Sequence, residues 1–95
     1  MANNLERVGF VAHGGKVQGV GFRYFTRERA QEYGITGWCR NTTDNKVEGE
    51  AQGQRDTLDK LLKDIDQGPR GAKVVDVTTE RKDVIEGESV FEVRR

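Results

Sequence analysis

Residues 7–34 read RVGFVAHGGKVQGVGFRYFTRERAQEYG, and this stretch decides the fold. Its first seven residues alternate between two faces, with Phe10 among the apolar side chains of one face, which is typical of a half-buried strand. Apolar side chains then recur at three- and four-residue spacings from Phe22 to Tyr33, and a glycine follows where a left-handed helix cap is wanted. The stretch therefore predicts a strand over residues 7–13, a glycine-rich loop and a helix.

A hairpin and a second helix are predicted next. Residues 35–41 and 46–52 are short strand candidates joined by a polar turn, which indicates a β-hairpin. Asp56 can cap a helix that ends at Gly68, because the proline that follows cannot continue it. The apolar stripe of this helix consists of Leu58, Leu61, Leu62 and Ile65.

The last part of the chain predicts two strands around a polar turn. Val75, Val77 and Thr79 indicate the first strand, residues 83–88 the turn, and residues 90–93 the last strand. The order of elements is then βαββαβ, in which two crossover units share a central hairpin. This order predicts a ferredoxin-like α+β sandwich, with an antiparallel sheet of four or five strands and both helices on one face.

The composition describes one small domain over residues 1–95. Lys and Arg total 16 and Asp and Glu total 16, so the formal net charge of zero gives no bulk attraction to nucleic acid or to an anionic membrane. No apolar run approaches the ~20 residues of a membrane-spanning helix, and the first residues lack the apolar stretch of a signal peptide. We therefore expect a cytoplasmic protein with no nucleic-acid or membrane partner.

Two residues that often carry chemistry are expected outside the site. Cys39 is the one cysteine of the chain, so it cannot form an internal disulfide, and without a neighbouring His or Lys motif it is interpreted as a small packing residue. His13 is the one histidine, and a lone histidine at a strand end is most often a surface or hydrogen-bonded residue. The chain has no Cys/His cluster, so no metal site is expected.

The loop from Gly14 to Gly21 is the strongest candidate for a binding site. Its glycines let consecutive amides converge, and the helix that follows offers free N–H groups and a partial positive charge. Arg23 adds a forked guanidinium on the first turn, so the three features together predict an anion cradle. The loop matches neither a Walker A motif nor G-x-G-x-x-G, and a plain glycine-rich turn with an exposed arginine remains the alternative.

Two segments resemble the signatures of the acylphosphatase family: GKVQGVGFRYF at residues 15–25 and GITGWCRN at residues 34–41. The likeness continues through VEGEAQG at residues 47–53 and FEV at residues 91–93, so it covers nearly the whole chain. The resemblance implies a ferredoxin-like fold and hydrolysis of acyl phosphates to carboxylate and inorganic phosphate, without metal or cofactor. It also implies that Arg23 binds the phosphate as a catalytic residue.

The resemblance assigns the remaining site residues as well. Asn41 matches the asparagine that orients the attacking water, so Arg23 and Asn41 are the expected catalytic pair. The expected phosphate-binding residues are Gly15, Lys16, Val17, Gln18, Gly19, Val20 and Gly21. Gly14 departs from the family pattern, which more often has a single glycine here. Either Gly14 is a substitution or the strand end holds an extra residue, and the register of the first strand stays open.

Two other interpretations remain. The same fold also serves non-catalytic modules that bind a phosphorylated metabolite or RNA. RNA is disfavoured by the neutral charge, and Asn41 distinguishes an enzyme from a phosphate-binding module, because pure binding has no use for a water-positioning amide. The chain could also be a piece like the acylphosphatase-like domain of a larger maturation enzyme. Its start at Met1 and its natural last strand favour a free-standing protein, which we expect to be a monomer.

Overall fold

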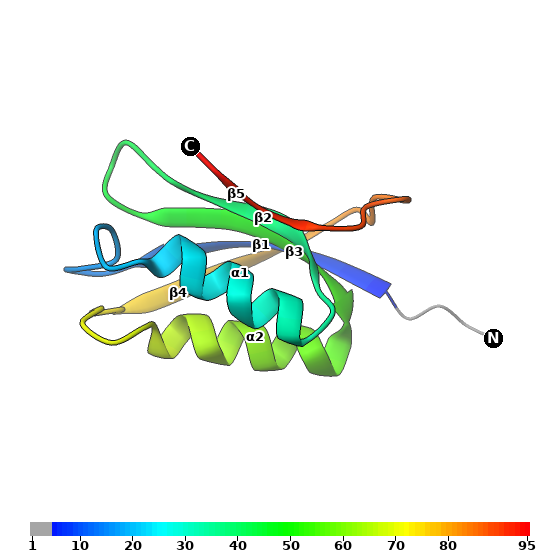
Figure 1. The fold of residues 1–95 in the computed structure, drawn as a ribbon, viewed down its shortest axis with the longest axis horizontal. Coiled ribbons are helices and arrows are strands. Elements are labelled where there is room, and N and C mark those ends of the chain that lie inside the picture. The colour runs from blue at the N-terminus through cyan, green and yellow to red at the C-terminus, as the bar shows by residue number, and fades with distance from the viewer. Residues whose placement is uncertain (1–4) are drawn as a thin grey trace.

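The computed structural model describes residues 5–95, which form two helices packed on one face of a five-stranded sheet (Figure 1). The elements are β1 (Leu5–His13), α1 (Phe22–Glu32), β2 (Thr36–Asn41), β3 (Val47–Gln54), α2 (Arg55–Gln67), β4 (Asp76–Lys82) and β5 (Phe91–Arg94). This is the predicted order of elements, the strand predicted at residues 90–93 being the fifth strand of the sheet, and it confirms the ferredoxin-like α+β fold. None of the helices in this part of the chain is long and apolar enough to cross a membrane.

The sheet is mixed, which corrects the expectation that it is antiparallel. Its strand order is β4-β1-β3-β2-β5, and three of the pairings are antiparallel, whereas β5 pairs with β2 in parallel. The cause lies in the connection after β4, which carries the chain from one edge of the sheet to the other. Residues 83–90 are too few for the crossover that a return parallel to β4 requires, so β5 runs opposite to β4. β2 also runs opposite to β4, because β4 pairs antiparallel with β1 while β1 and β2 both pair antiparallel with β3, and β5 is therefore parallel to β2.

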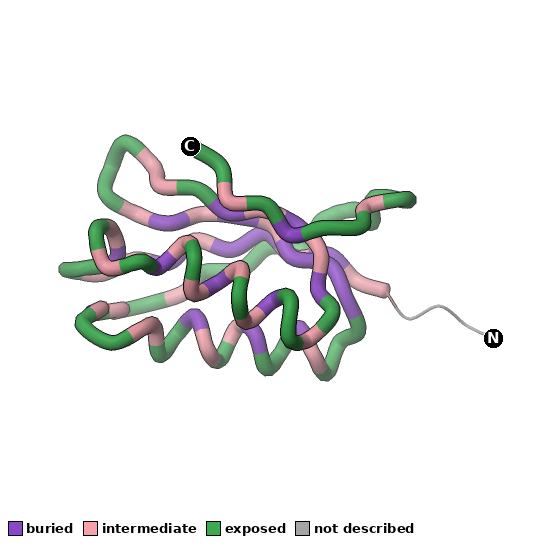
Figure 2. The backbone as a smooth tube through the Cα atoms, viewed as in Figure 1, coloured by how far each residue is buried: buried purple, intermediate pink, exposed green. Residues whose placement is uncertain are grey.

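The core lies between the sheet and the helices, where Figure 2 shows the buried segments. The alternation predicted for β1 is confirmed, because Phe10 and Ala12 are buried on the face that packs against the helices. The predicted stripe of α2 also holds, with Leu58, Leu61 and Ile65 buried against the sheet. Val75 is the exception among the predicted strand residues: it is 81% exposed and precedes β4.

Asp56 does not cap α2 as predicted. The N-cap is Gln54, the last residue of β3, and its side chain makes no capping hydrogen bond. Because β3 runs directly into the helix, α2 begins at Arg55 and Asp56 lies in its first turn. There its carboxylate accepts a hydrogen bond of 2.9 Å from the amide of Thr57 and still complements the positive end of the helix.

The pairing of β1 is continuous to its end at His13, so the strand contains no extra residue before Gly14. Gly14 is therefore a substitution relative to the family pattern. His13 pairs with Asp76 in an unbroken ladder with β4. A Cβ added to Gly14 would lie 1.9 Å from the carbonyl oxygen of Lys73. Glycine is required at this position because the two backbones approach so closely.

Within residues 5–95 no helix covers the other face of the sheet, and a buried arginine organises part of it. Arg7 is only 1% exposed, and its guanidinium donates to Glu50 at 2.6 Å and to Glu88 at 2.7 Å. A third hydrogen bond, of 3.2 Å, runs to Gln52. Glu88 lies between β4 and β5, so this network fastens the connection that crosses the sheet.

Candidate active site

The loop between β1 and α1 presents a free helix N-terminus. Gly19 and Gly21 adopt left-handed backbone conformations, with φ of 76° and 73°, which glycine adopts at little cost. Gly21 is the N-cap of α1, makes no side-chain capping hydrogen bond, and accepts the first helical hydrogen bond from Phe25 at 2.9 Å. The amides of residues 22–24 therefore have no acceptor within the helix. Since the first turn contains no acidic residue, this end of α1 suits an anion.

A small pocket of about 90 Å³ lies against this helix end. It is lined by Val17, Gly19, Gly21, Phe22, Arg23, Tyr24 and Asn41. Asn41 is the last residue of β2, so the sheet and the helix each contribute one polar side chain to the same pocket.

Arg23 is oriented by the strand at the sheet edge. Its Nη1 donates a hydrogen bond of 3.0 Å to the carbonyl oxygen of Arg94 in β5. A guanidinium has five N–H donors, so this bond leaves most of them available to a ligand. The guanidinium carbon also lies 5.9 Å from the centre of the Tyr24 ring, within the range of a cation–π interaction.

Gln18 fastens the loop to the hairpin that follows Asn41. Its side-chain amide donates to the carbonyl oxygens of Thr42 and Lys46, each at 2.9 Å. Thr42 directly follows Asn41, and Lys46 precedes β3. One side chain therefore sets the position of the loop relative to the end of β2.

Cys39 lies behind the site and is fully buried, which confirms its interpretation as a packing residue. Its thiol donates a hydrogen bond of 3.6 Å to the carbonyl oxygen of Arg23. Burial raises the pKa of the Cys39 thiol to about 12, and the positive charges of Arg23 and Arg27 only partly oppose this effect. The thiol is therefore protonated near neutral pH and is a poor nucleophile.

A model of the acylphosphatase family matches residues 9–93 of the sequence. The chain belongs to the acylphosphatase family. It is 46% identical over 81 residues to the acylphosphatase of Salinibacter ruber, covering 85% of each chain. Against the acylphosphatase of Methanospirillum hungatei it is 40% identical over 92 residues, covering 96% of this chain and 99% of the relative.

Solved structures of the family have the same fold. The acylphosphatase from Bacillus subtilis superposes with a TM-score of 0.88 at 31% identity, covering 96% of this chain and 99% of that chain. The acylphosphatase from Coxiella burnetii also gives a TM-score of 0.88, at 38% identity, covering 96% of this chain and 94% of that chain.

In this member of the family, the residues predicted to bind phosphate fall into two groups. Val17, Gly19 and Gly21 line the small pocket together with Arg23 and Asn41. The others do not line it: Gly15, Lys16, Gln18 and Val20. The backbone of Lys16 is engaged elsewhere, since it accepts a hydrogen bond of 2.8 Å from the amide of Lys73.

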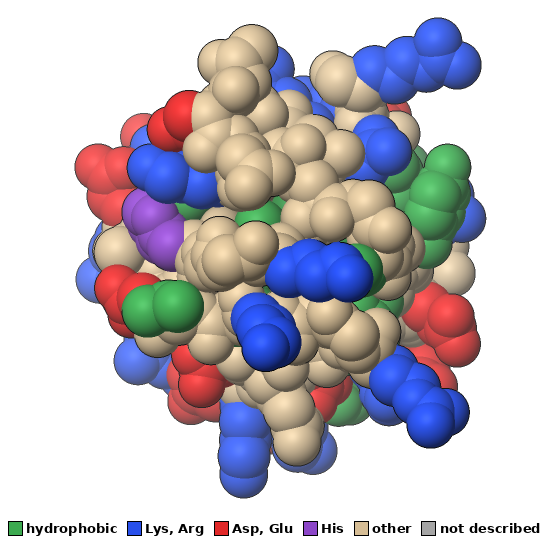
Figure 3. Space-filling view, turned by 90° about the vertical axis from the view of Figure 1, so that its left-hand side faces the viewer, with side chains coloured by type: hydrophobic (Ala, Val, Ile, Leu, Met, Phe, Trp, Pro, Cys, Tyr) green, Lys and Arg blue, Asp and Glu red, His purple; other side chains and the backbone are tan. Residues whose placement is uncertain are grey.

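Three residues beside the site had no part in the sequence-based assignment: Tyr24, Arg27 and Arg95. Tyr24 is 56% exposed, whereas its neighbour Phe22 on the same helix is buried. Arg27 follows Arg23 by four residues on a helix, and that spacing places both on one face, so the sequence did carry a signal for it. Figure 3 looks onto this end of the molecule, where Lys and Arg side chains stand on an uncharged surface and acidic side chains lie towards the edge.

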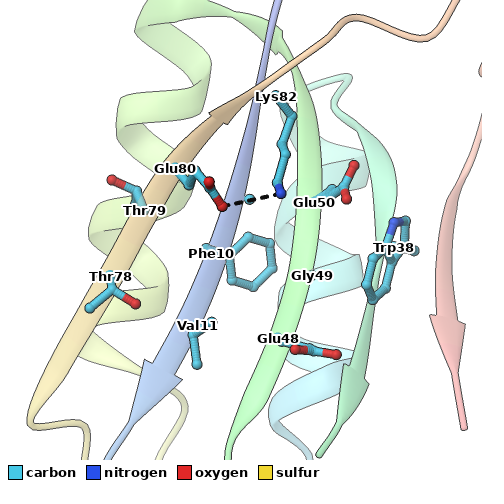
Figure 4. Close-up of a pocket in the computed structure, with 11 residues that line it drawn as sticks. Phe10, Val11, Trp38, Glu48, Gly49, Glu50, Thr78, Thr79, Glu80 and Lys82 are labelled. Atoms are coloured by element: carbon cyan, nitrogen blue, oxygen red, sulfur yellow. Dashed lines mark ion pairs between the residues drawn. The ribbon is translucent and has the colours of Figure 1, made fainter.

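A separate hollow of about 240 Å³ lies on the helix-free face of the sheet (Figure 4). Its three acidic side chains are all paired with cations, namely Glu48 with Arg40, Glu50 with Arg7 and Glu80 with Lys82. The lining itself contains three carboxylates and one cation, Lys82, so it suits a phosphate less well than the pocket at α1, which has an arginine and, among the described residues, no carboxylate. His13 lies on the same face and its Nε2 is 3.2 Å from the hydroxyl of Thr78, outside the pocket at α1. Residues 5–95 contain no group of three side chains suited to hold a metal ion.

Proposed function

We propose that this protein hydrolyses acyl phosphates to a carboxylate and inorganic phosphate, with Arg23 and Asn41 as catalytic residues. The observation that carries the proposal is that Arg23 and Asn41 line one pocket at the uncapped N-terminus of α1. Membership of the acylphosphatase family supports the reaction class.

The phosphoryl group binds to backbone amides and to Arg23. Phosphoryl transfer passes through a loose transition state with charge on the equatorial oxygens, so positioned donors and positive charge supply most of the catalysis. The free amides of residues 22–24 and the unused N–H groups of Arg23 are such donors. They require neither a metal ion nor a cofactor.

Asn41 positions the attacking water. A neutral amide holds water by hydrogen bonds and, unlike a carboxylate, does not repel the anionic substrate. The water oxygen forms a bond to phosphorus while the bond from phosphorus to the acyl oxygen breaks, and the bonding electrons leave with the carboxylate. The leaving carboxylate has a pKa of about 4, so it needs no protonation. The proton of the water passes to a phosphate oxygen of the substrate.

A direct assay tests the proposal. Purified protein is incubated with acetyl phosphate, with and without a chelator, and the loss of substrate is measured. We expect turnover that the chelator does not change. Binding of inorganic phosphate without turnover would show a non-catalytic phosphate-binding module instead, and chelator sensitivity would contradict the metal-free mechanism.

We also propose that the protein acts in the cytoplasm as a monomer. The monomer is supported by the composition, since a chain with 34% charged residues has a mostly polar surface. The location is supported by the single cysteine, since the fold does not depend on a disulfide and hence on an oxidising compartment. Size-exclusion chromatography and cell fractionation test these two points, and a dimer peak or a membrane-bound fraction would contradict them.

A further inference from the structure

A larger pocket of about 560 Å³ adjoins the small one. It is lined by Arg23, Tyr24, Arg27, Asn41, Val93 and Arg95. Arg23 and Asn41 line both pockets, so the large pocket is within reach of the acyl group of a substrate whose phosphoryl group occupies the small one.

The large pocket has an uncompensated positive charge. The chain contains 10 arginines, and in the described part of the chain six of them form ion pairs with carboxylates. The four arginines without an ion pair there are Arg23, Arg27, Arg70 and Arg95, and three of these line this pocket. No carboxylate side chain lines it. A chain of zero net charge thus concentrates unpaired guanidinium groups beside its phosphate site.

Arg27 is held in place by an aromatic ring. Its guanidinium carbon lies 5.3 Å from the centre of the Tyr24 ring, and Arg23 lies 5.9 Å from the same centre. A cation–π contact with the ring restricts the freedom of each arginine side chain, so less entropy is lost when a ligand binds. Arg27 follows Arg23 by one helical turn, which separates the two charges along the pocket.

We propose that Arg27 selects acyl phosphates whose acyl group carries a second anionic group, for which a free carboxylate is the test case. The guanidinium fork binds a carboxylate through two parallel hydrogen bonds. Arg95 is a second guanidinium without a side-chain ion pair in the described part of the chain, and it lines the same pocket. This inference rests on the proposed function, because it concerns the acyl end of the same substrate.

Two matched substrates test it. Succinyl phosphate and butyryl phosphate have acyl groups of equal carbon number, and they differ in that a carboxylate replaces a methyl group. We expect kcat/KM to be about tenfold higher for succinyl phosphate, as for a charge-assisted hydrogen bond that is partly exposed. The preference should shrink at high salt, because salt screens exposed charges.

Variants assign the preference to Arg27. In Arg27→Gln the ratio of the two kcat/KM values should collapse towards one, mainly through a higher KM for succinyl phosphate. Arg27→Lys keeps the charge but loses the fork, so it should retain an intermediate ratio. Arg70→Gln is the control, because Arg70 is also unpaired among the described residues and lines neither pocket, and it should keep the full ratio. Thermal unfolding midpoints establish that each variant is folded.

The results distinguish a failure of the proposed role of Arg27 from a failure of the proposed function. A wild-type ratio within twofold of one, or a full ratio in Arg27→Gln, overturns the role of Arg27 while the hydrolase assignment stands. If acetyl, butyryl and succinyl phosphate are all left intact, the proposed function fails and this inference fails with it.

Discussion

The side-chain amide of Gln18 lies 2.9 Å from the carbonyl oxygen of Thr42 and donates a hydrogen bond to it. The two residues are 24 positions apart in the sequence, and the bond joins the loop before α1 to the residue next to Asn41. In the proposed mechanism the loop amides bind the phosphoryl group and Asn41 holds the water, so the distance and direction between these two groups must be fixed. This hydrogen bond and the one from the same amide to the carbonyl oxygen of Lys46 hold the loop to the hairpin, so the removal of the Gln18 amide tests whether that relation matters.

We expect Gln18→Ala to lower kcat by about ten- to hundredfold, since small misplacements of reacting groups have effects of this size. The measurement is steady-state hydrolysis of acetyl phosphate, beside a circular dichroism spectrum to establish folding. Gln31→Ala, at an exposed position of α1, is the matched control and should behave as the wild type. Wild-type kcat in Gln18→Ala would show that the loop does not need this tether.

Arg23→Ala and Asn41→Ala should each lower kcat by about 10²–10³, the usual effect of removing one preorganised donor. Only Arg23→Ala should also weaken competitive inhibition by inorganic phosphate, because Asn41 acts on the water. Kinetics with increasing phosphate separate the two roles. Full turnover by Asn41→Ala would contradict the proposed role of the amide.

Adjacent glycines should respond differently to alanine. A Cβ on Gly14 would lie 1.9 Å from the Lys73 carbonyl oxygen, whereas a Cβ on Gly15 would meet nothing within 4 Å. We expect Gly14→Ala to lower the free energy of unfolding by about 1–3 kcal/mol, as other overpacked substitutions do. Gly15→Ala should stay within about 0.5 kcal/mol of the wild type. Urea denaturation measures both, and equal stabilities would show that the close approach relaxes freely.

Glu88 should make stability depend on pH in acid. Burial alone would raise the pKa of Glu88, but hydrogen bonds from Arg7 and Thr36 outweigh it, so the pKa lies below its ordinary value. The unfolded state then binds a proton more readily, so this stabilisation is present above the ordinary pKa of about 4.5 and is lost as the pH falls through the native pKa.

The matched variant is Glu88→Gln, which lacks the titrating group. The difference in unfolding free energy between wild type and Glu88→Gln should be largest near pH 7 and should shrink below pH 4.5. Glu86→Gln, at an exposed position of the same connection, is the control and should show a small, pH-independent difference. A constant difference from pH 7 to pH 3 for Glu88→Gln would contradict the role of the Arg7 pair.

Cys39 should resist thiol reagents in the native protein. Its side chain is fully buried and the pKa of its thiol is about 12, so little thiolate exists at pH 8. Labelling with iodoacetamide should be negligible under native conditions, and in guanidinium chloride it should reach one group per chain, in line with the single cysteine. Rapid native labelling would indicate that β2 opens locally.

Much of the fold was predictable because it follows from local patterns. The alternation around Phe10 and the stripe that includes Leu61 specify which face of each element is buried, and both faces are buried as predicted. The sequence did not show that β5 pairs in parallel with β2, since strand neighbours depend on where a connection crosses the sheet. Asp56 was misplaced as a cap for a related reason: β3 continues to Gln54, and a strand end is set by its partners.

For the site, the sequence by itself showed which chemical groups are available. Four glycines, the start of a helix and one arginine on its first turn are local features, and they predicted an anion cradle, whereas the role of Asn41 was implied by the resemblance to the acylphosphatase family. Only the tertiary structure decided which groups meet. It brings Asn41 to the same pocket as Arg23, uses Gln18 as a tether, and leaves Arg27 unpaired beside the site. Such relations join residues far apart in the chain, so they depend on packing, which no local pattern of residues encodes.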